Sequence, residues 1–172
     1  LALAAWAEPY IVVCYEKGII SGDGNANFEP LRNITRSEFV KMLSIAFNLP
    51  KSNKQITFAD VSEDDWYHDY VRDAVAAGIV NGYGNNYFGS SDFITRQDMC
   101  VMLYRAAKNK LENKNITADF ADMDAVAGYA KDSVTALVNA GVINGSNGMV
   151  YPLSYATRAE TAKVLASIIW ED

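Results

Sequence analysis

The chain has 172 residues, of which 50% are hydrophobic and 21% are charged, the balance of a folded globular protein. Its net charge of -6 argues against binding to the phosphate backbone of a nucleic acid, which usually needs a basic surface. No apolar run approaches the length of about 18 residues that a membrane-spanning helix requires, so we expect neither a nucleic-acid partner nor insertion into a membrane.

The chain begins with a short apolar segment, residues 1–5. Residues 1–5 lack preceding basic residues and are too few for an intact signal peptide, so we expect a removed signal or a start inside a larger protein. A helical stretch follows, and the same stretch occurs twice more. In each, apolar residues at i, i+3 and i+4 lead to a Gly suited to a helix C-terminus. The three sets are Ile11, Cys14, Tyr15 and Gly18; Val71, Ala74, Val75 and Gly78; and Val134, Leu137, Val138 and Gly141.

A polar loop rich in Gly and Asn then leads to Thr-Arg and a second helical stretch. The second stretches have the same apolar spacing. Their residues are Phe39, Met42, Leu43 and Ala46; Met99, Met102, Leu103 and Ala106; and Thr161, Val164, Leu165 and Ile168. Arg36 precedes Arg96 by 60 residues, and Arg96 precedes Arg158 by 62. Self-similarity at a nearly fixed period indicates a repeat architecture.

Polar connectors at residues 48–57 and 108–119 join the copies and lead into Phe-Ala-Asp. One helix pair of about 50 residues buries too little surface to be stable alone. We therefore predict an all-α fold in which three helix-loop-helix repeats share one helical core with pseudo-threefold symmetry. The single module covers residues 1–172, with repeats at 1–47 (truncated at its N-terminus), 58–107 and 120–170.

Two cysteines and one histidine bear on metal and redox chemistry. Two distant thiols and a lone imidazole cannot form a zinc site, and we expect no metal and no cofactor. Cys14 and Cys100 lie on apolar helical stripes and are predicted to be buried, with a single disulfide as the alternative. His68 has no counterpart in the other repeats, which favours a surface position.

Several motifs together resemble the S-layer homology family. They are Trp6-Ala7, Gly18-Ile19-Ile20, Phe28-Glu29-Pro30 and Ile34-Thr35-Arg36-Ser37-Glu38, and related motifs recur in all three copies. The resemblance implies a three-pronged spindle with binding grooves between neighbouring repeats. It also implies a non-catalytic module that anchors a secreted bacterial protein by binding secondary cell-wall polysaccharide, commonly with pyruvylated amino sugars. The expected location is extracellular, at the cell wall or S-layer surface, with a monomeric module in a parent protein able to self-assemble.

The Arg of each Thr-Arg pair needs a partner. Thr and the acid three residues later have capping-box spacing. Starting a helix can therefore be the whole role of these two residues. A cation at a helix N-terminus instead costs about 0.3–1 kcal/mol. The partner is either an internal carboxylate, such as Asp60, Asp122 or Glu38, or a ligand carboxylate held by bidentate hydrogen bonds and by free helix N-terminal amides. The resemblance favours the ligand.

The candidate ligand-binding residues come from all three repeats. They are Arg36, Arg96 and Arg158; the acids Glu38, Asp98, Glu160, Asp60 and Asp122; the aromatic residues Trp6, Trp66 and Tyr129; and the loop glycines Gly22, Gly82 and Gly145. The aromatic residues can equally be core residues, and the glycines can equally form tight turns. Repeat two departs from the family pattern at Gln97-Asp98 and Phe88-Gly89-Ser90, and repeat three at Ala156, so we expect unequal grooves.

Other functions are disfavoured by the same residues. Residues 23–27 begin like a calcium-binding EF-hand loop, but Phe28 replaces its required Gly and Ile34 its bidentate Glu. No nucleophile and base recur at a suggestive spacing, so we do not expect an enzyme. A structural helical adaptor that binds a protein partner is the alternative function.

Overall fold

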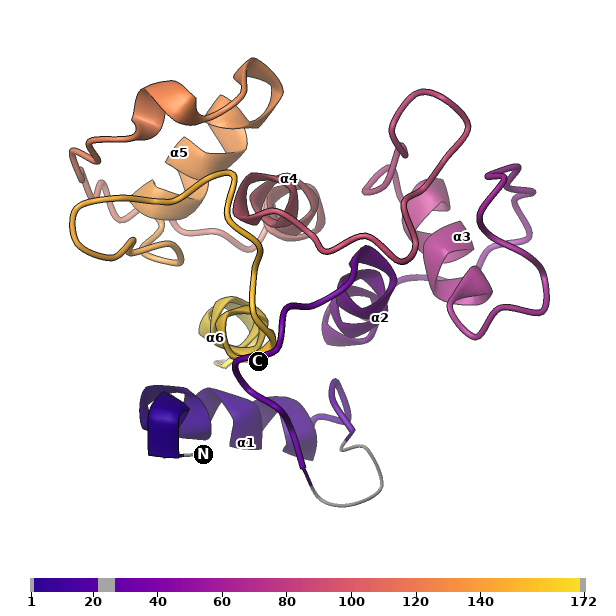
Figure 1. Cartoon of the computed structure of the whole chain (residues 1–172), viewed down its shortest axis with the longest axis horizontal. Coiled ribbons are helices and arrows are strands. Elements are labelled where there is room, and N and C mark those ends of the chain that lie inside the picture. Colours follow the sequence, from indigo (N-terminus) through magenta and orange to yellow (C-terminus); the bar gives the residue numbers. More distant parts are fainter. Residues whose placement is uncertain (1, 22–26, 171–172) are drawn as a thin grey trace.

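The computed structural model describes residues 2–21 and 27–170, which form six α-helices and three short 3-10 helices without a β-strand (Figure 1). The elements are η1 Ala2–Ala7, α1 Glu8–Glu16, α2 Arg36–Ala46, α3 His68–Ala76, α4 Arg96–Ala107, η2 Met123–Ala125, η3 Gly128–Ala130, α5 Lys131–Asn139 and α6 Arg158–Ile169. Helices α2, α4 and α6 form the centre, and α1, α3 and α5 lie around them (Figure 1). The predicted all-α class and pseudo-threefold arrangement are confirmed.

The helices pair across repeats. Helix α3 of repeat two packs on α2 of repeat one, and α5 of repeat three packs on α4 of repeat two. The cycle closes when α1 of repeat one packs on α6 of repeat three, where Cys14 Sγ lies 3.5 Å from the carbonyl oxygen of Ala162. Each of these three helix pairs, or prongs, therefore combines one helix from each of two repeats, and the two ends of the described chain are joined by packing.

Three residues just before the central helices mark the pseudo-threefold axis. The amide of Ile34 donates to the carbonyl of Ala156, that of Ala156 donates to Ile94, and that of Ile94 donates to Ile34, over 3.0–3.1 Å. All three side chains are fully buried. Because the ring is closed, all three repeats fix the position of the loops around it.

Each central helix starts with a threonine cap. Thr35, Thr95 and Thr157 each accept a hydrogen bond from the backbone amide three residues later. The full capping box predicted for the first and third of these is present, since Glu38 and Glu160 also accept from the threonine amides. Such caps satisfy amides that a helix N-terminus leaves unpaired.

Most apolar residues of the predicted stripes are buried, with one clear exception. Tyr15 is 67% exposed, so its placement on the buried stripe of α1 is wrong. Cys14 and Cys100 are free thiols in the core, as predicted, and burial raises the pKa of each to about 12. His68 is half-buried rather than on the open surface, with Nδ1 3.1 Å from Asp69 Oδ1. Among the described helices, none has the length and apolar character needed to cross a membrane.

Candidate ligand-binding grooves

Each Arg of the Thr-Arg pairs crosses to the next repeat in the cycle. Arg36 Nε donates to the carbonyl of Phe88 over 2.9 Å, and Arg96 Nε donates to that of Val150 over 2.8 Å. Arg158 closes the cycle by donating from Nε to the carbonyl of Phe28, 2.9 Å away. One edge of each guanidinium is thus fixed to a loop, which leaves its Nη groups to face an acid.

The acid lies three residues after the capping threonine of that next repeat. Arg96 Nη1 donates to Glu160 Oε1, while Arg158 Nη1 lies 3.8 Å from Glu38 Oε1. Arg36 Nη1 lies 3.7 Å from Asp98 Oδ2. The three Arg side chains differ in exposure, which is 4% for Arg36, 13% for Arg158 and 15% for Arg96. Arg158 and Arg96 therefore expose more of their side chains to solvent than Arg36 does.

The first amides of the central helices are not free. The amides of Arg36, Arg96 and Arg158 donate to loop carbonyls of Asp92, Ser154 and Arg32, each over 2.9 Å. The amides one residue later also donate to carbonyls of the same loops. The expectation that free helix amides add to anion binding is therefore wrong, because the neighbouring repeat uses them.

Asp60 and Asp122 clamp loops and do not pair with the repeated arginines. The Asp60 carboxylate accepts from the amides of Phe88, Gly89 and Ser90, each over 2.8 Å. Asp122 accepts from the amides of Val150 and Tyr151 over 2.8 and 2.7 Å. Of the three internal carboxylates considered as Arg partners, only Glu38 takes that role.

Replacing Asp60 tests the clamp. Burial alone would raise the pKa of Asp60, but the amide hydrogen bonds outweigh it and hold the pKa below its ordinary value. A depressed folded-state pKa adds stability above the unfolded-state pKa of about 3.9, and this is lost as the pH falls through the folded value. Asp60→Asn should lower the free energy of unfolding at pH 7 by about 1.5–3 kcal/mol and weaken its dependence on acid pH.

Urea unfolding at a series of pH values measures both effects. Asp64→Asn, which changes an exposed acid nearby in the chain, is the matched control and should leave both quantities nearly unchanged. Equal stability of Asp60→Asn and the wild type would rule out the clamp.

The loop glycines are explained by packing. Gly82 has a φ of +69° beneath the ring of Phe58, and a Cβ there would lie 2.6 Å from the ring atom Cε1. Gly145 has a φ of +63° beneath Phe120, and it also lines a groove. Gly22 and most of the calcium-loop candidate at 23–27 lie outside the described residues. The described residues contain no group of three His, Cys, Asp or Glu side chains arranged to hold a metal ion.

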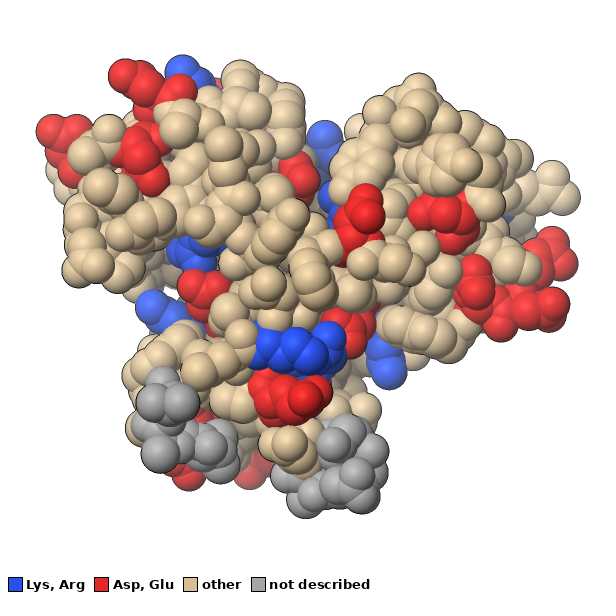
Figure 2. Space-filling view, in the orientation of Figure 1, with Lys and Arg blue, Asp and Glu red and all other residues tan. Residues whose placement is uncertain are grey.

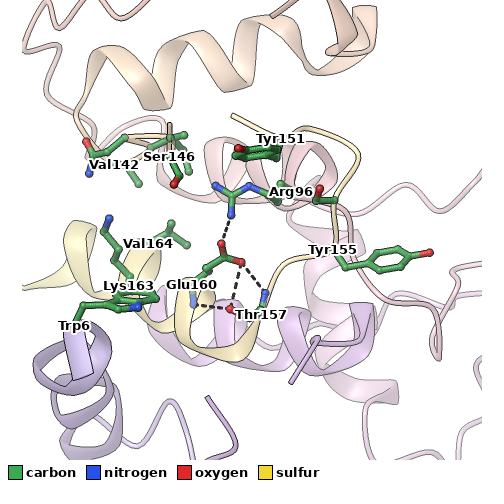
Figure 3. Close-up of a pocket in the computed structure, with 14 residues that line it drawn as sticks. Trp6, Arg96, Val142, Ser146, Tyr151, Tyr155, Thr157, Glu160, Lys163 and Val164 are labelled. Atoms are coloured by element: carbon green, nitrogen blue, oxygen red, sulfur yellow. Dashed lines mark hydrogen bonds and ion pairs between the residues drawn. The ribbon is translucent and has the colours of Figure 1, made fainter. Parts of the chain in front are cut away.

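Groove A combines residues of all three repeats in a cavity of about 520 Å³. Helix α6 contributes Glu160 and Lys163, repeat two contributes Arg96, and repeat one contributes Trp6. Trp6 and Lys163 lie at one end, with the Arg96–Glu160 pair in the middle (Figure 3). Lys163 Nζ is 6.0 Å from the Trp6 ring centroid, and Trp6 is 48% exposed, so its ring is open to the groove.

Groove B has the same composition one step around the axis, in a cavity of about 220 Å³. Glu38 and Lys41 come from α2, Arg158 from repeat three and Trp66 from repeat two. Lys41 Nζ is 5.6 Å from the Trp66 ring centroid, and Trp66 is 56% exposed. The exposure of both tryptophans argues against the core alternative. Neither lysine was predicted from the sequence, although each follows a repeated Arg by five residues.

The third position, groove C, has a different composition. Val101 occupies the place of the lysine, and Tyr129 that of the tryptophan. Tyr129 Oη donates to Asp98 Oδ1 over 2.7 Å and accepts from Gln97 Nε2 over 3.1 Å. Burial and the bond to Asp98 raise the pKa of Tyr129 to about 12, so the phenol remains a donor. The Gln97-Asp98 departure in repeat two thus holds a tyrosine over its own groove.

The charge of the three positions also differs. Groove A has two cations and one acid, and groove B has Arg158, Lys41 and the nearby Arg32 around Glu38. Groove C instead has two acids, Asp92 and Asp98, near the buried Arg36. Figure 2 shows basic side chains mainly where prongs meet, next to some acidic ones, and further acidic side chains at the outer ends of prongs. The electrostatics therefore favour anions at A and B rather than at C.

Comparisons with known proteins agree with the repeat analysis. A family model described as S-layer homology domain matches residues 3–40, 57–100 and 119–162. An endoglucanase of Bacillus sp. (strain KSM-635) is 30% identical over 97% of this chain, and Exoglucanase XynX of Acetivibrio thermocellus is 32% identical over 95%. A surface-layer 125 kDa protein of Lysinibacillus sphaericus is 31% identical over 97%. The matches cover 18%, 15% and 14% of these relatives, respectively.

Proposed function

The chain belongs to the S-layer homology family, whose modules anchor surface proteins to the cell wall, and from this premise we propose that grooves A and B bind secondary cell-wall polysaccharide. One observation carries the proposal. At two pseudo-equivalent positions, an Arg, a Lys and an exposed Trp meet around a helix-capping Glu, and the Arg and Trp come from two other repeats. The packing of a single repeat does not explain why the same residue types recur in two grooves, each of which is built by three repeats.

The proposed ligand is a sugar with a carboxylate, such as a pyruvylated amino sugar. Its carboxylate pairs with the Lys ammonium and with the Nη groups of the Arg, which it shares with the capping Glu, because charge-assisted hydrogen bonds are the strongest available there. The Trp ring packs against the apolar face of the sugar, since aromatic rings provide large rigid contact surfaces. The capping Glu keeps the Arg oriented before the ligand arrives, which lowers the entropic cost of binding.

In the parent protein, we take the module to act as a monomeric anchor outside the cell. Any hydrolytic activity of a longer parent, such as those named for the endoglucanase and exoglucanase relatives, would belong to other parts of that protein. Two grooves on one rigid module can engage one polymer together, and such bivalent binding can raise the avidity by about 10²–10⁴ over one site.

Sedimentation with bacterial wall sacculi tests the proposal. The module should co-sediment with sacculi that carry secondary polymer and stay in solution after chemical removal of that polymer. A folded module that ignores polymer-bearing walls from several bacteria would contradict the proposal. Capture of a purified surface protein by the same sample would then favour the helical adaptor.

The number of sites gives a further prediction. Calorimetric titration with the methyl glycoside of a pyruvylated N-acetylhexosamine should show two sites per chain. Trp6→Ala and Trp66→Ala should each weaken a different one at least tenfold, about 1.4 kcal/mol, because each removes the aromatic surface of one groove.

Tyr129→Phe is the matched aromatic change, and it should leave both sites intact. A third site of similar strength in the wild type would show that groove C binds as well. A single site that survives both Trp substitutions would remove grooves A and B from the proposal.

A further inference from the structure

Groove A is larger than groove B, and the two differ in the residue that lies beside the capping Glu. In groove B, Arg32 lies across Glu38 with Nη2 2.6 Å from Oε1 and Nη1 3.2 Å from Oε2. Its Nε also pairs with Glu29 over 3.3 Å. In groove A, the corresponding residue is Ser154, which lines the cavity. The space beside Glu160 is therefore open in groove A. In groove B, the Arg32–Glu38 ion pair fills the equivalent space.

Aromatic side chains border this open space. Tyr151 lies beside Arg96, and Tyr155 lies at the end of groove A opposite Trp6, with its ring directed away from the Arg96–Glu160 pair (Figure 3). Tyr155 is 53% exposed, and its ring centroid is 5.5 Å from that of Phe93, which is 43% exposed. The residue of repeat one that corresponds to Tyr155 is Asn33, so groove B has no such aromatic surface.

Tyr151 adds a second observation. It has a φ of +52°, and its amide is held by Asp122 Oδ2. The corresponding residues of the other repeats also have a positive φ, +51° for Glu29 and +80° for Gly89, so this backbone conformation belongs to the repeat fold. The side chain at the position differs between repeats, so the fold does not need a tyrosine there. In repeat three, the conserved turn places a phenol in the groove.

We propose that Tyr151, Ser154 and Tyr155 form a second subsite of groove A, which binds a neutral sugar ring next to the anionic sugar. The inference rests on the proposed function and extends it. Tyrosine offers an apolar face for the ring and hydroxyl groups for its polar edge. Groove A therefore recognises at least a disaccharide of the polymer, and groove B recognises a single sugar because Arg32 closes the same space.

Calorimetry with two probes tests this subsite in a Trp66→Ala background, in which groove B is disabled. The first probe is the methyl glycoside of a pyruvylated N-acetylhexosamine, and the second is the disaccharide with one additional neutral N-acetylhexosamine. The disaccharide should bind groove A about tenfold more tightly than the monosaccharide. Tyr155→Asn and Ser154→Arg, which introduce the residues of repeat one, should each bring the ratio of disaccharide to monosaccharide affinity down to about one.

Three results would overturn the inference. Equal binding of the two probes would show that the second ring makes no contact, although the proposed function would stand. A Tyr155→Asn variant that keeps the disaccharide gain but loses self-association in sedimentation would assign the aromatic pair to a contact between copies. If the protein with both grooves intact binds neither probe, the proposed function itself fails, and the subsite fails with it.

Discussion

Replacing both groove lysines, Lys41→Ala with Lys163→Ala, should reduce the affinity for polymer-bearing walls by at least a hundredfold. Each lysine lies beside an exposed tryptophan and a capping glutamate, where it would pair with the ligand carboxylate. Loss of one such charge pair costs about 2 kcal/mol or more, and loss in both grooves also removes bivalent avidity. Quantitative co-sedimentation with sacculi measures the change.

The lysines are better targets than the arginines because they leave the fold intact. In grooves A and B, Arg96 and Arg158 are each hydrogen-bonded to a loop carbonyl of another repeat, so the loss of either changes structure and binding together. Lys54→Ala with Lys131→Ala removes the same total charge from exposed positions outside both grooves and should bind nearly as the wild type does. If both double variants lose binding equally, the attraction is a general charge effect and the grooves are not the site.

The sequence predicted what local patterns determine. Apolar spacing identified the helices and the buried Cys14 and Cys100, and Thr-x-x-Glu spacing identified the caps at Thr35 and Thr157. It also gave unequal grooves, through Gln97-Asp98. These features depend on residues within one helical turn or on one helix face. Such residues are close in the sequence and also close in space.

The features that the sequence left open depend on distant pairings. A helical stripe shows that a face is buried but not which helix covers it, so the packing of α1 on α6 did not follow from periodicity. Arg96 pairs with Glu160, 64 residues away, and only closure of the three repeats brings these groups together. Tyr15 shows that spacing can also predict too much. It fits the apolar stripe of α1, but none of the other described helices covers the stripe at that position, and the side chain is exposed.

Arg36→Ala should have the opposite effect to the lysine pair, with a large loss of stability and little loss of wall binding. The Arg36 guanidinium lies 4.4 Å from the ring centroid of Tyr83 and 5.2 Å from that of Phe88, and its Nε bonds the Phe88 carbonyl. Removing it leaves the carbonyl without this donor and removes two cation–π contacts. Losses of about 1–3 and 1–2 kcal/mol give an expected decrease of about 2–5 kcal/mol in the free energy of unfolding.

Urea unfolding followed by circular dichroism measures this change, and co-sedimentation below the unfolding transition measures binding. Arg36→Lys should fall between the wild type and the alanine variant, because Lys retains the charge but not the planar fork that bonds the carbonyl and stacks on rings. Binding should persist in both variants, since Tyr129 occupies Asp98 and Val101 replaces the lysine in groove C. A stable Arg36→Ala variant that no longer binds walls would instead make Arg36 a ligand residue and groove C a binding site.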